Sequence, residues 1–457
     1  MSELRTIARH AGTLLVGQLA TMAFGVTDTI VAGRYSETAL AALSVGSAVY
    51  ISVFVGLMGV MQALLPTWAE LHGRALTARA GQHHHHELGR SVRQALYLAL
   101  ILGVVGIVAL GFPDPLLQFT EVPMALQGEV RGYLSVLALA LPPALLFRMF
   151  STLNQSLGRP QLVTWLQALS LVAKVPLTIW FVFGGLGLPA LGAPGCAWAT
   201  VVVNWLLVAM ALWLLRTQSL YTPYAVWARM ERPDWRAIWD FARLGLPAGL
   251  SVMVEVTSFT LMALFVARQG TLAAAAHQIA SNLAAVMYMM PLSLAIATSA
   301  RVSYWLGAGE PKRARATIRT GFKLGWGLAL VVAATVFLAR ERIAAIYSAQ
   351  ADVVLLASGL LAWLGLYHLG DATQALCVFV LRCYRVAVAP LVAYCVLLWG
   401  VGLGGGFMLA YRGLGPWPAM QSPAAFWIAA TAALGIIVFI LPLILWRAVR
   451  RYHPTQP

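Results

Sequence analysis

Long apolar stretches recur along the whole 457-residue chain, and they limit the folds that it can adopt. Twelve of these stretches are long enough to cross a bilayer as helices, which takes ~20 residues. A helix satisfies every backbone N–H and C=O within its own segment, as a lipid environment requires. Charged residues make up only 10% of the sequence, against about 25% in soluble domains. We therefore predict an all-α, polytopic membrane protein whose partner is the lipid bilayer.

The predicted spans fall into two groups of six. They lie near residues 7–33, 40–70, 88–112, 127–157, 160–184, 193–216, 244–268, 272–305, 316–339, 353–382, 387–411 and 423–447. Leu40-Ala-Ala-Leu43 in the second span is matched by Leu272-Ala-Ala-Ala275 in the eighth. With six spans each, both groups enter the membrane from the same side, as parallel repeats do. We expect two pseudo-symmetric six-helix lobes, 1–216 and 235–457, joined by a cytoplasmic linker, 217–234.

The basic residues are concentrated on one side of the predicted membrane. With the N-terminus placed in the cytoplasm, inner segments hold 23 of the 31 Lys and Arg residues and outer loops hold six, while Arg148 and Lys174 lie within spans. This positive-inside bias predicts cytoplasmic N- and C-termini in a bacterial-type inner membrane. These loops account for the net charge of +15, so we expect no nucleic-acid partner.

Three acidic residues lie inside predicted spans: Asp28 in the first, Glu255 in the seventh and Asp371 in the tenth. A charge at the bilayer centre costs roughly 2.5–3.5 kcal/mol on insertion scales. Each acid must therefore face a cavity or a partner, and such acids commonly mark substrate and ion pathways. The alternative is that they only hold helices together through hydrogen bonds or ion pairs. We interpret the chain as a transporter.

Two further groups accompany these acids. Tyr367 lies one helical turn before Asp371, where its ring or hydroxyl can help to hold a cation. Alternatively, it is an ordinary interface aromatic. Lys174, in the fifth span, needs an acid or backbone carbonyls as a partner, and Asp28 is the candidate in the same half.

The eighth span carries candidate substrate-binding residues. Gln278 and Asn282 are one turn apart and share a helix face. Tyr288 follows within the run Met287-Tyr288-Met289-Met290, and methionine-rich surfaces suit promiscuous binding. These residues either line a cavity or pack and bond between helices.

Other polar clusters give little support for a cofactor or a structural metal. His83-His84-His85-His86 lies in a predicted cytoplasmic loop and has no acidic partner cluster, so we interpret it as a solvated loop. The four cysteines show no CxxC pairing, and we interpret them as small buried hydrophobes.

The chain resembles the NorM branch of the multidrug and toxic compound extrusion (MATE) family nearly from end to end. The segments that carry the resemblance are Val26-Thr-Asp28-Thr29-Ile-Val-Ala-Gly33, the Gly- and Pro-rich run 184–200, Leu244-Gly-Leu-Pro247 followed by Glu255, Ala276-His277-Gln278-Ile279, Met289-Met-Pro291-Leu-Ser293 and Tyr367-His-Leu-Gly370-Asp371. The resemblance implies a monomer of two six-helix lobes that exports cationic or amphiphilic drugs in exchange for Na⁺ or H⁺.

The resemblance also implies roles for single residues. Acids matching Asp28, Glu255 and Asp371, with the tyrosine matching Tyr367, are associated with ion binding or coupling in this branch. Relatives often carry asparagine where this chain has Lys174, and an ammonium there disfavours Na⁺ in the N-terminal lobe. We therefore expect any Na⁺ site at Glu255 and Asp371, and we leave the role of Asp28 in binding drug or proton open.

A competition mechanism fits these residues. A proton, a Na⁺ ion or an organic cation can each neutralise a buried acid, and exchange follows if ion and drug exclude one another. One rival is a flippase for a lipid-linked precursor from the same superfamily, which needs basic cavities for anionic head groups. The other is a polytopic membrane enzyme, for which the sequence shows no catalytic cluster. We expect no enzymatic activity.

Overall fold

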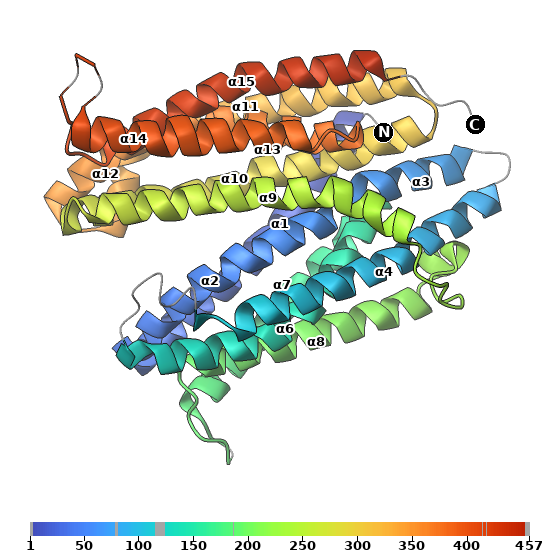
Figure 1. Ribbon diagram of the computed structural model, residues 1–457, viewed down its shortest axis with the longest axis horizontal. Coiled ribbons are helices and arrows are strands. Elements are labelled where there is room, and N and C mark those ends of the chain that lie inside the picture. Colours follow the sequence, from blue (N-terminus) through green and yellow to red (C-terminus); the bar gives the residue numbers. More distant parts are fainter. Residues whose placement is uncertain are drawn as a thin grey trace. The chain divides into compact units, whose positions relative to one another are not determined.

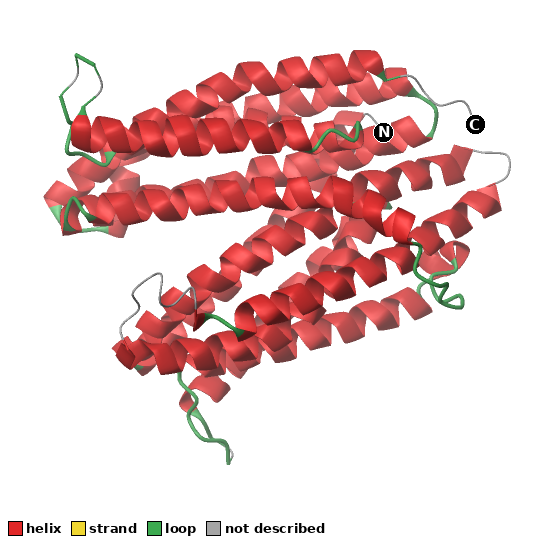
Figure 2. Ribbon diagram, in the orientation of Figure 1, coloured by secondary structure: helices red, strands yellow, loops and turns green. Residues whose placement is uncertain are grey.

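The computed structural model describes residues 3–77, 81–114, 124–185, 187–413, 415–416 and 418–452, and helices make up almost all of them (Figures 1 and 2). Within these residues, the β-structure is a single isolated bridge between Gly185 and Leu188. Twelve helical segments of the described chain are long and apolar enough to cross a bilayer. The predicted all-α, twelve-span architecture is therefore confirmed.

The helices are labelled in Figure 1. In chain order they are α1 (Glu3–Tyr35), α2 (Glu37–Gln62), α3 (Leu65–Thr77), α4 (Gly81–Gly111), α6 (Met124–Ser156), α7 (Pro160–Phe183), α8 (Ala193–Thr217), η1 (Ser219–Tyr224), α9 (Trp235–Ala267), α10 (Thr271–Gly307), α11 (Pro311–Tyr347), α12 (Ala351–Cys383), α13 (Val388–Tyr394), η2 (Cys395–Gly404), α14 (Gly405–Phe407), η3 (Met408–Arg412) and α15 (Ala424–Arg451). The second span combines α2 and α3, and the eleventh runs from α13 to η3.

Local sequence signals mark several helix ends. The Ser36 side chain accepts a hydrogen bond from the Ala39 amide at 3.0 Å and caps α2. Pro160 begins α7 and Pro311 begins α11, positions where the missing proline N–H costs nothing. Gly184, at φ +78°, ends α7 in a conformation that favours glycine.

The chain forms two compact units. The N-unit is Val16–Gly249, and the C-unit combines Met1–Leu15 with Leu250–Pro457. In the N-unit, α6 packs against α2, α4 and α8. In the C-unit, α12 packs against α10, α11 and α15, and it is continuously buried from Gly370 to its end at Cys383. These two central helices carry Arg148 and Asp371, whereas Asp28, Lys174 and Glu255 lie on α1, α7 and α9.

The polar segment before α9 is bound to the N-unit through α4. Arg93 donates hydrogen bonds to both carboxylate oxygens of Glu231 and, at 2.6 Å, to the Ala225 carbonyl. The Gln94 amide donates to the Arg232 carbonyl at 3.0 Å and accepts from the Asp234 amide at 2.8 Å. These bonds fix a segment that contains little regular structure.

The binding of this segment should weaken only in acid. The hydrogen bond from Arg93 holds the pKa of Glu231 below its ordinary value of 4.5. A lowered pKa gives stabilisation that is complete above the ordinary value and is lost as pH falls through the folded value. We expect amide hydrogen exchange over 219–231, corrected for intrinsic rates, to rise only below that ordinary value.

Glu231→Gln should remove this rise in hydrogen exchange at low pH (the acid step), because Gln carries no titrating carboxylate. Asp240→Asn, at an exposed site on α9, is the matched control and should leave the step in place. An acid step of unchanged size in Glu231→Gln would assign the pH dependence to another group.

Candidate functional site

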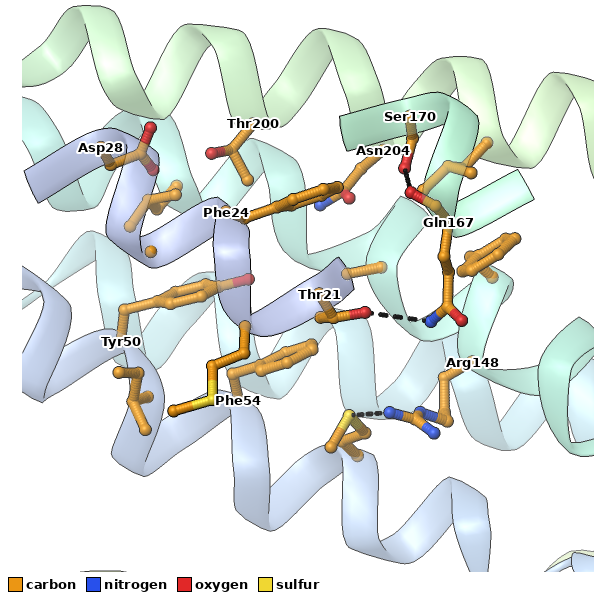
Figure 3. Close-up of a pocket in the computed structure, with 18 of the residues that line it drawn as sticks. Thr21, Phe24, Asp28, Tyr50, Phe54, Arg148, Gln167, Ser170, Thr200 and Asn204 are labelled. Carbon is orange, nitrogen blue, oxygen red and sulfur yellow. Dashed lines mark hydrogen bonds between the residues drawn. The ribbon is translucent and has the colours of Figure 1, made fainter. Parts of the chain in front are cut away.

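The N-unit encloses a cavity of about 360 Å³, shown in Figure 3. Helices α1, α2, α6, α7 and α8 all contribute to its wall. Five aromatic side chains, Phe24, Tyr50, Phe54, Tyr133 and Phe147, line it, together with a few polar groups. This volume and lining fall within the range of small-molecule sites, which are mostly apolar with a few placed polar groups.

Asp28 lies in the wall of this cavity and forms a buried ion pair. The Lys174 ammonium is 2.9 Å from Asp28 Oδ1, and Lys174 is fully buried. Thr178 also donates to Oδ1, at 3.3 Å. Lys174 further donates to the Cys196 carbonyl at 3.0 Å and to the Thr200 hydroxyl at 2.6 Å. The structure therefore brings together Asp28 and Lys174 from α1 and α7, which the sequence had only suggested as partners.

The C-unit holds the other two acids next to one another. Glu255 comes from α9 and Asp371 from α12, and both are buried. The Gln374 amide donates to Glu255 Oε1 at 2.9 Å and to Asp371 Oδ1 at 3.1 Å. One neutral side chain thus bridges two carboxylates inside the membrane span. Two charges in such a place need a proton or a cation beside them, and the buried Arg382 guanidinium of α12 interacts electrostatically with Glu255.

Tyr367 closes the C-unit site with other aromatic rings. Its ring lies edge-on to Phe259 at 6.0 Å and to Trp427 at 5.8 Å, between centroids. A small cavity of about 20 Å³ touches Glu255, Ser258 and Tyr367. That volume is enough for about one water-sized species. The cavity has room for a single small cation or water molecule beside Glu255, whereas Asp371 and Gln374 are not part of its lining.

The remaining predicted residues lie on α10, outside the linings of both cavities. Gln278 and Asn282 are exposed and bond to one another at 3.1 Å. Tyr288 is partly buried. Their neighbour His277 is buried and accepts a hydrogen bond from Trp427 at 3.2 Å. Their link with substrate stays a prediction.

The structure adds residues that the sequence interpretation did not single out. Gln374 is three positions after Asp371, so helical spacing could have placed it on the same face. Its contact with Glu255, which is 119 residues away, could not be predicted from the sequence around either residue. Cys395 is exposed, so the interpretation of all four cysteines as buried was wrong for this one. An apolar span presents side chains to lipid as well as to the core.

The histidine run lies at the start of the helix α4, so the prediction that it forms a loop was wrong. The side chains of His83 and His84 are outside the described residues, and His85 and His86 are described. Among the residues that the structure does describe, no group of three or more His, Cys, Asp or Glu is placed to hold a metal ion.

Comparison with known proteins gives a consistent result over the whole chain. The MatE family model matches residues 14–180 and 247–408. A probable multidrug resistance protein NorM from Aromatoleum aromaticum is 39% identical over 98% of this chain and 95% of its own length. The multidrug resistance protein PmpM from Pseudomonas aeruginosa is 32% identical over 99% of this chain and 93% of its own.

Solved structures share the fold at low sequence identity. The eukaryotic MATE transporter AtDTX14 superposes with a TM-score of 0.84 at 21% identity, covering 98% of both chains. A Vibrio cholerae MATE transporter, VcmN, gives a TM-score of 0.82 at 18% identity, covering 99% of this chain and 98% of its own.

Proposed function

The chain belongs to the MatE family, and on that premise we propose that it is a secondary active multidrug efflux transporter. In this proposal it exports cationic and amphiphilic compounds in exchange for Na⁺ or H⁺. Relatives that span nearly the full chain are named as multidrug resistance proteins. The observation that carries the proposal is the Glu255–Gln374–Asp371 cluster, because two buried carboxylates in a span can take up and release a cation.

Ion coupling is assigned to the C-unit. Glu255 and Asp371 supply carboxylate oxygens, and the unbonded Gln374 amide oxygen is buried beside them. Oxygen ligands suit a hard cation such as Na⁺, and a proton can occupy the same site by neutralising one carboxylate. Tyr367 and its aromatic neighbours shield the cluster and strengthen its electrostatic interactions. A bound ion of either kind neutralises one of the two carboxylate charges.

Substrate binding is assigned first to the N-unit cavity. Its aromatic walls suit flat amphiphilic compounds, and Asp28 offers the one carboxylate in its lining. Gln278, Asn282 and Tyr288 remain candidates for contacts along the substrate's path. Exchange requires that the ion and the substrate each favour a different one of the two access states.

The remaining features of the proposal concern the setting of the chain. We place it as a monomer in a bacterial inner membrane, with both termini in the cytoplasm, as the bias of Lys and Arg indicates. The lobes are 1–216 and 235–457, joined by 217–234. Transport requires no catalytic step on the substrate and no cofactor besides the ion.

Proteoliposomes test the proposal directly. We expect an imposed Na⁺ gradient or an imposed pH gradient to drive efflux of a fluorescent organic cation, and collapse of the gradient to stop it. The gradient supplies the free energy, and differential binding of the ion to the two access states couples it to efflux. Transport at the same rate without either gradient would refute an antiporter.

A further inference from the structure

Arg148 is a cation inside a membrane span that no carboxylate of the described residues neutralises. It lies on α6 and lines the N-unit cavity. Its guanidinium contacts the Met58 thioether at 2.7 Å, and none of the ion pairs between described residues includes it. A guanidinium has five N–H donors, and a thioether is a weak acceptor. Most of its bonding capacity is therefore unused within a cavity wall.

The balance of charge in the cavity is positive. Asp28 and Arg148 are the charged residues in the lining, and the charge of Asp28 is already matched by Lys174. The other polar groups, such as Thr21 and Gln167, are neutral and bond to one another at 3.1 Å. A surplus positive charge in a mostly apolar cavity favours a ligand with a negative group.

The shape of the site separates its charged ends. In Figure 3, Asp28 and Arg148 lie at opposite corners of the drawn residues, with the rings of Phe24 and Phe54 between them. Lys174 and Thr178 both donate to Asp28 Oδ1, and no described residue bonds its Oδ2. One end of the cavity thus keeps a free carboxylate oxygen, and the other keeps free guanidinium donors.

We propose that Arg148 binds the carboxylate of an amphiphilic aromatic substrate, and that the N-unit cavity thereby selects zwitterionic compounds over simple cations. The planar guanidinium fork can take both oxygens of a carboxylate. The aromatic body of the ligand lies against Phe24 and Phe54, and its amine faces Asp28 Oδ2. This inference rests on the proposed efflux function and names the class of compound exported.

A phosphate group offers the same negative charge to Arg148, and it would come from a lipid. The cavity volume of about 360 Å³ fits one drug-sized molecule, whereas a lipid-linked precursor is much larger. Dodecyl phosphate as a competitor distinguishes the two sources. Dodecyl phosphate and the unbound carboxylate dye are each compared by the concentration that displaces half of the bound dye. A lower concentration for dodecyl phosphate would overturn the assignment to carboxylate compounds.

Two dyes that differ only at the carboxylate test the proposal. Tetramethylrhodamine is a zwitterion with a free carboxylate, and its methyl ester is a cation with the same rings. Fluorescence anisotropy with the purified full-length protein gives the affinity for each. We expect Arg148→Gln to weaken binding of the free acid by at least about tenfold, because a charged hydrogen-bonded pair is lost. Binding of the ester should change by less than about twofold, because its binding does not use the pair.

Further variants guard against misinterpretation. Arg148→Lys keeps the charge but loses the fork, so its affinity for the free acid should be intermediate. Arg131→Gln, at an exposed site on the same helix, is the matched control and should change neither affinity. Retained binding of the ester shows that Arg148→Gln is folded. Equal losses for both dyes, or no loss for the free acid, would overturn the proposal.

This binding assay uses no gradient, so it fails separately from the proposed function. Efflux of either dye in proteoliposomes, combined with unchanged affinities in Arg148→Gln, would refute the role of Arg148 alone. Selective binding without gradient-driven efflux would refute the antiporter and leave the role of Arg148 standing.

Discussion

Asp371→Asn is expected to abolish ion-driven efflux while leaving substrate binding in the N-unit intact. Asn keeps the shape of the side chain and its contact with Gln374, but it carries no charge for a proton or Na⁺ to neutralise. Keeping a charge inside a span costs roughly 2.5–3.5 kcal/mol, and an ion that neutralises the charge removes this cost. That free energy corresponds to about a hundredfold in ion affinity. We therefore expect the gradient-driven rate in proteoliposomes to fall by about that factor.

Three companion variants make this result specific. Glu255→Gln should reduce the rate to a similar degree, since both carboxylates share the Gln374 amide. Gln374→Met should have a smaller effect and raise the ion concentration needed for half-maximal exchange, because both acids remain. Asp352→Asn, at an exposed position in the first turn of the same helix, is the matched control. If efflux by Asp371→Asn still depended fully on the ion gradient, the C-unit cluster would have no part in the coupling mechanism.

The sequence predicts the helical architecture well because the bilayer imposes it. Each span must be apolar and about 20 residues long, so composition alone locates it. Interruptions inside spans are harder to predict. The break at Ala63 and Leu64 between α2 and α3 is followed by Pro66, which lacks the N–H that would bond the Gln62 carbonyl and so gives a local signal that the twelve predicted spans did not use. The π-helical stretch Cys395–Gly404 is as apolar as an ordinary helix, and its apolar composition does not distinguish it from one.

The candidate sites were predictable only in part. Isolated charges in apolar spans identified Asp28, Glu255, Asp371 and Lys174, because their presence there is costly. Pairing depends on which helices lie side by side, and no spacing rule connects Glu255 to Gln374 across 119 residues. The N-unit boundary at Val16 falls inside the continuous helix α1, where the sequence offers no signal.

The other large effect is expected at the buried pair of Asp28 and Lys174. Removing one partner of a buried ion pair costs about 3–5 kcal/mol, because the other charge stays buried without compensation. Lys174 is fully buried and the Asp28 side chain is only 11% exposed, so water cannot replace the missing partner. We expect Lys174→Met to lower the free energy of unfolding by about that amount. Titration with SDS in mixed micelles measures it.

The double variant Asp28→Asn with Lys174→Met should recover most of this loss, because it leaves no charge behind. The two single variants and the double variant form a double-mutant cycle, and the same cycle with Arg131→Met and Asp114→Asn is the matched control. That pair is half-exposed in the same unit, so its coupling energy should stay within about 0–1 kcal/mol. A coupling energy equally small for Asp28 and Lys174 would mean that Asp28 is neutral and that Lys174 is held by Cys196 and Thr200 alone. Asp28 would then be available to take up a coupling proton, and the assignment of coupling to the C-unit alone would have to be given up.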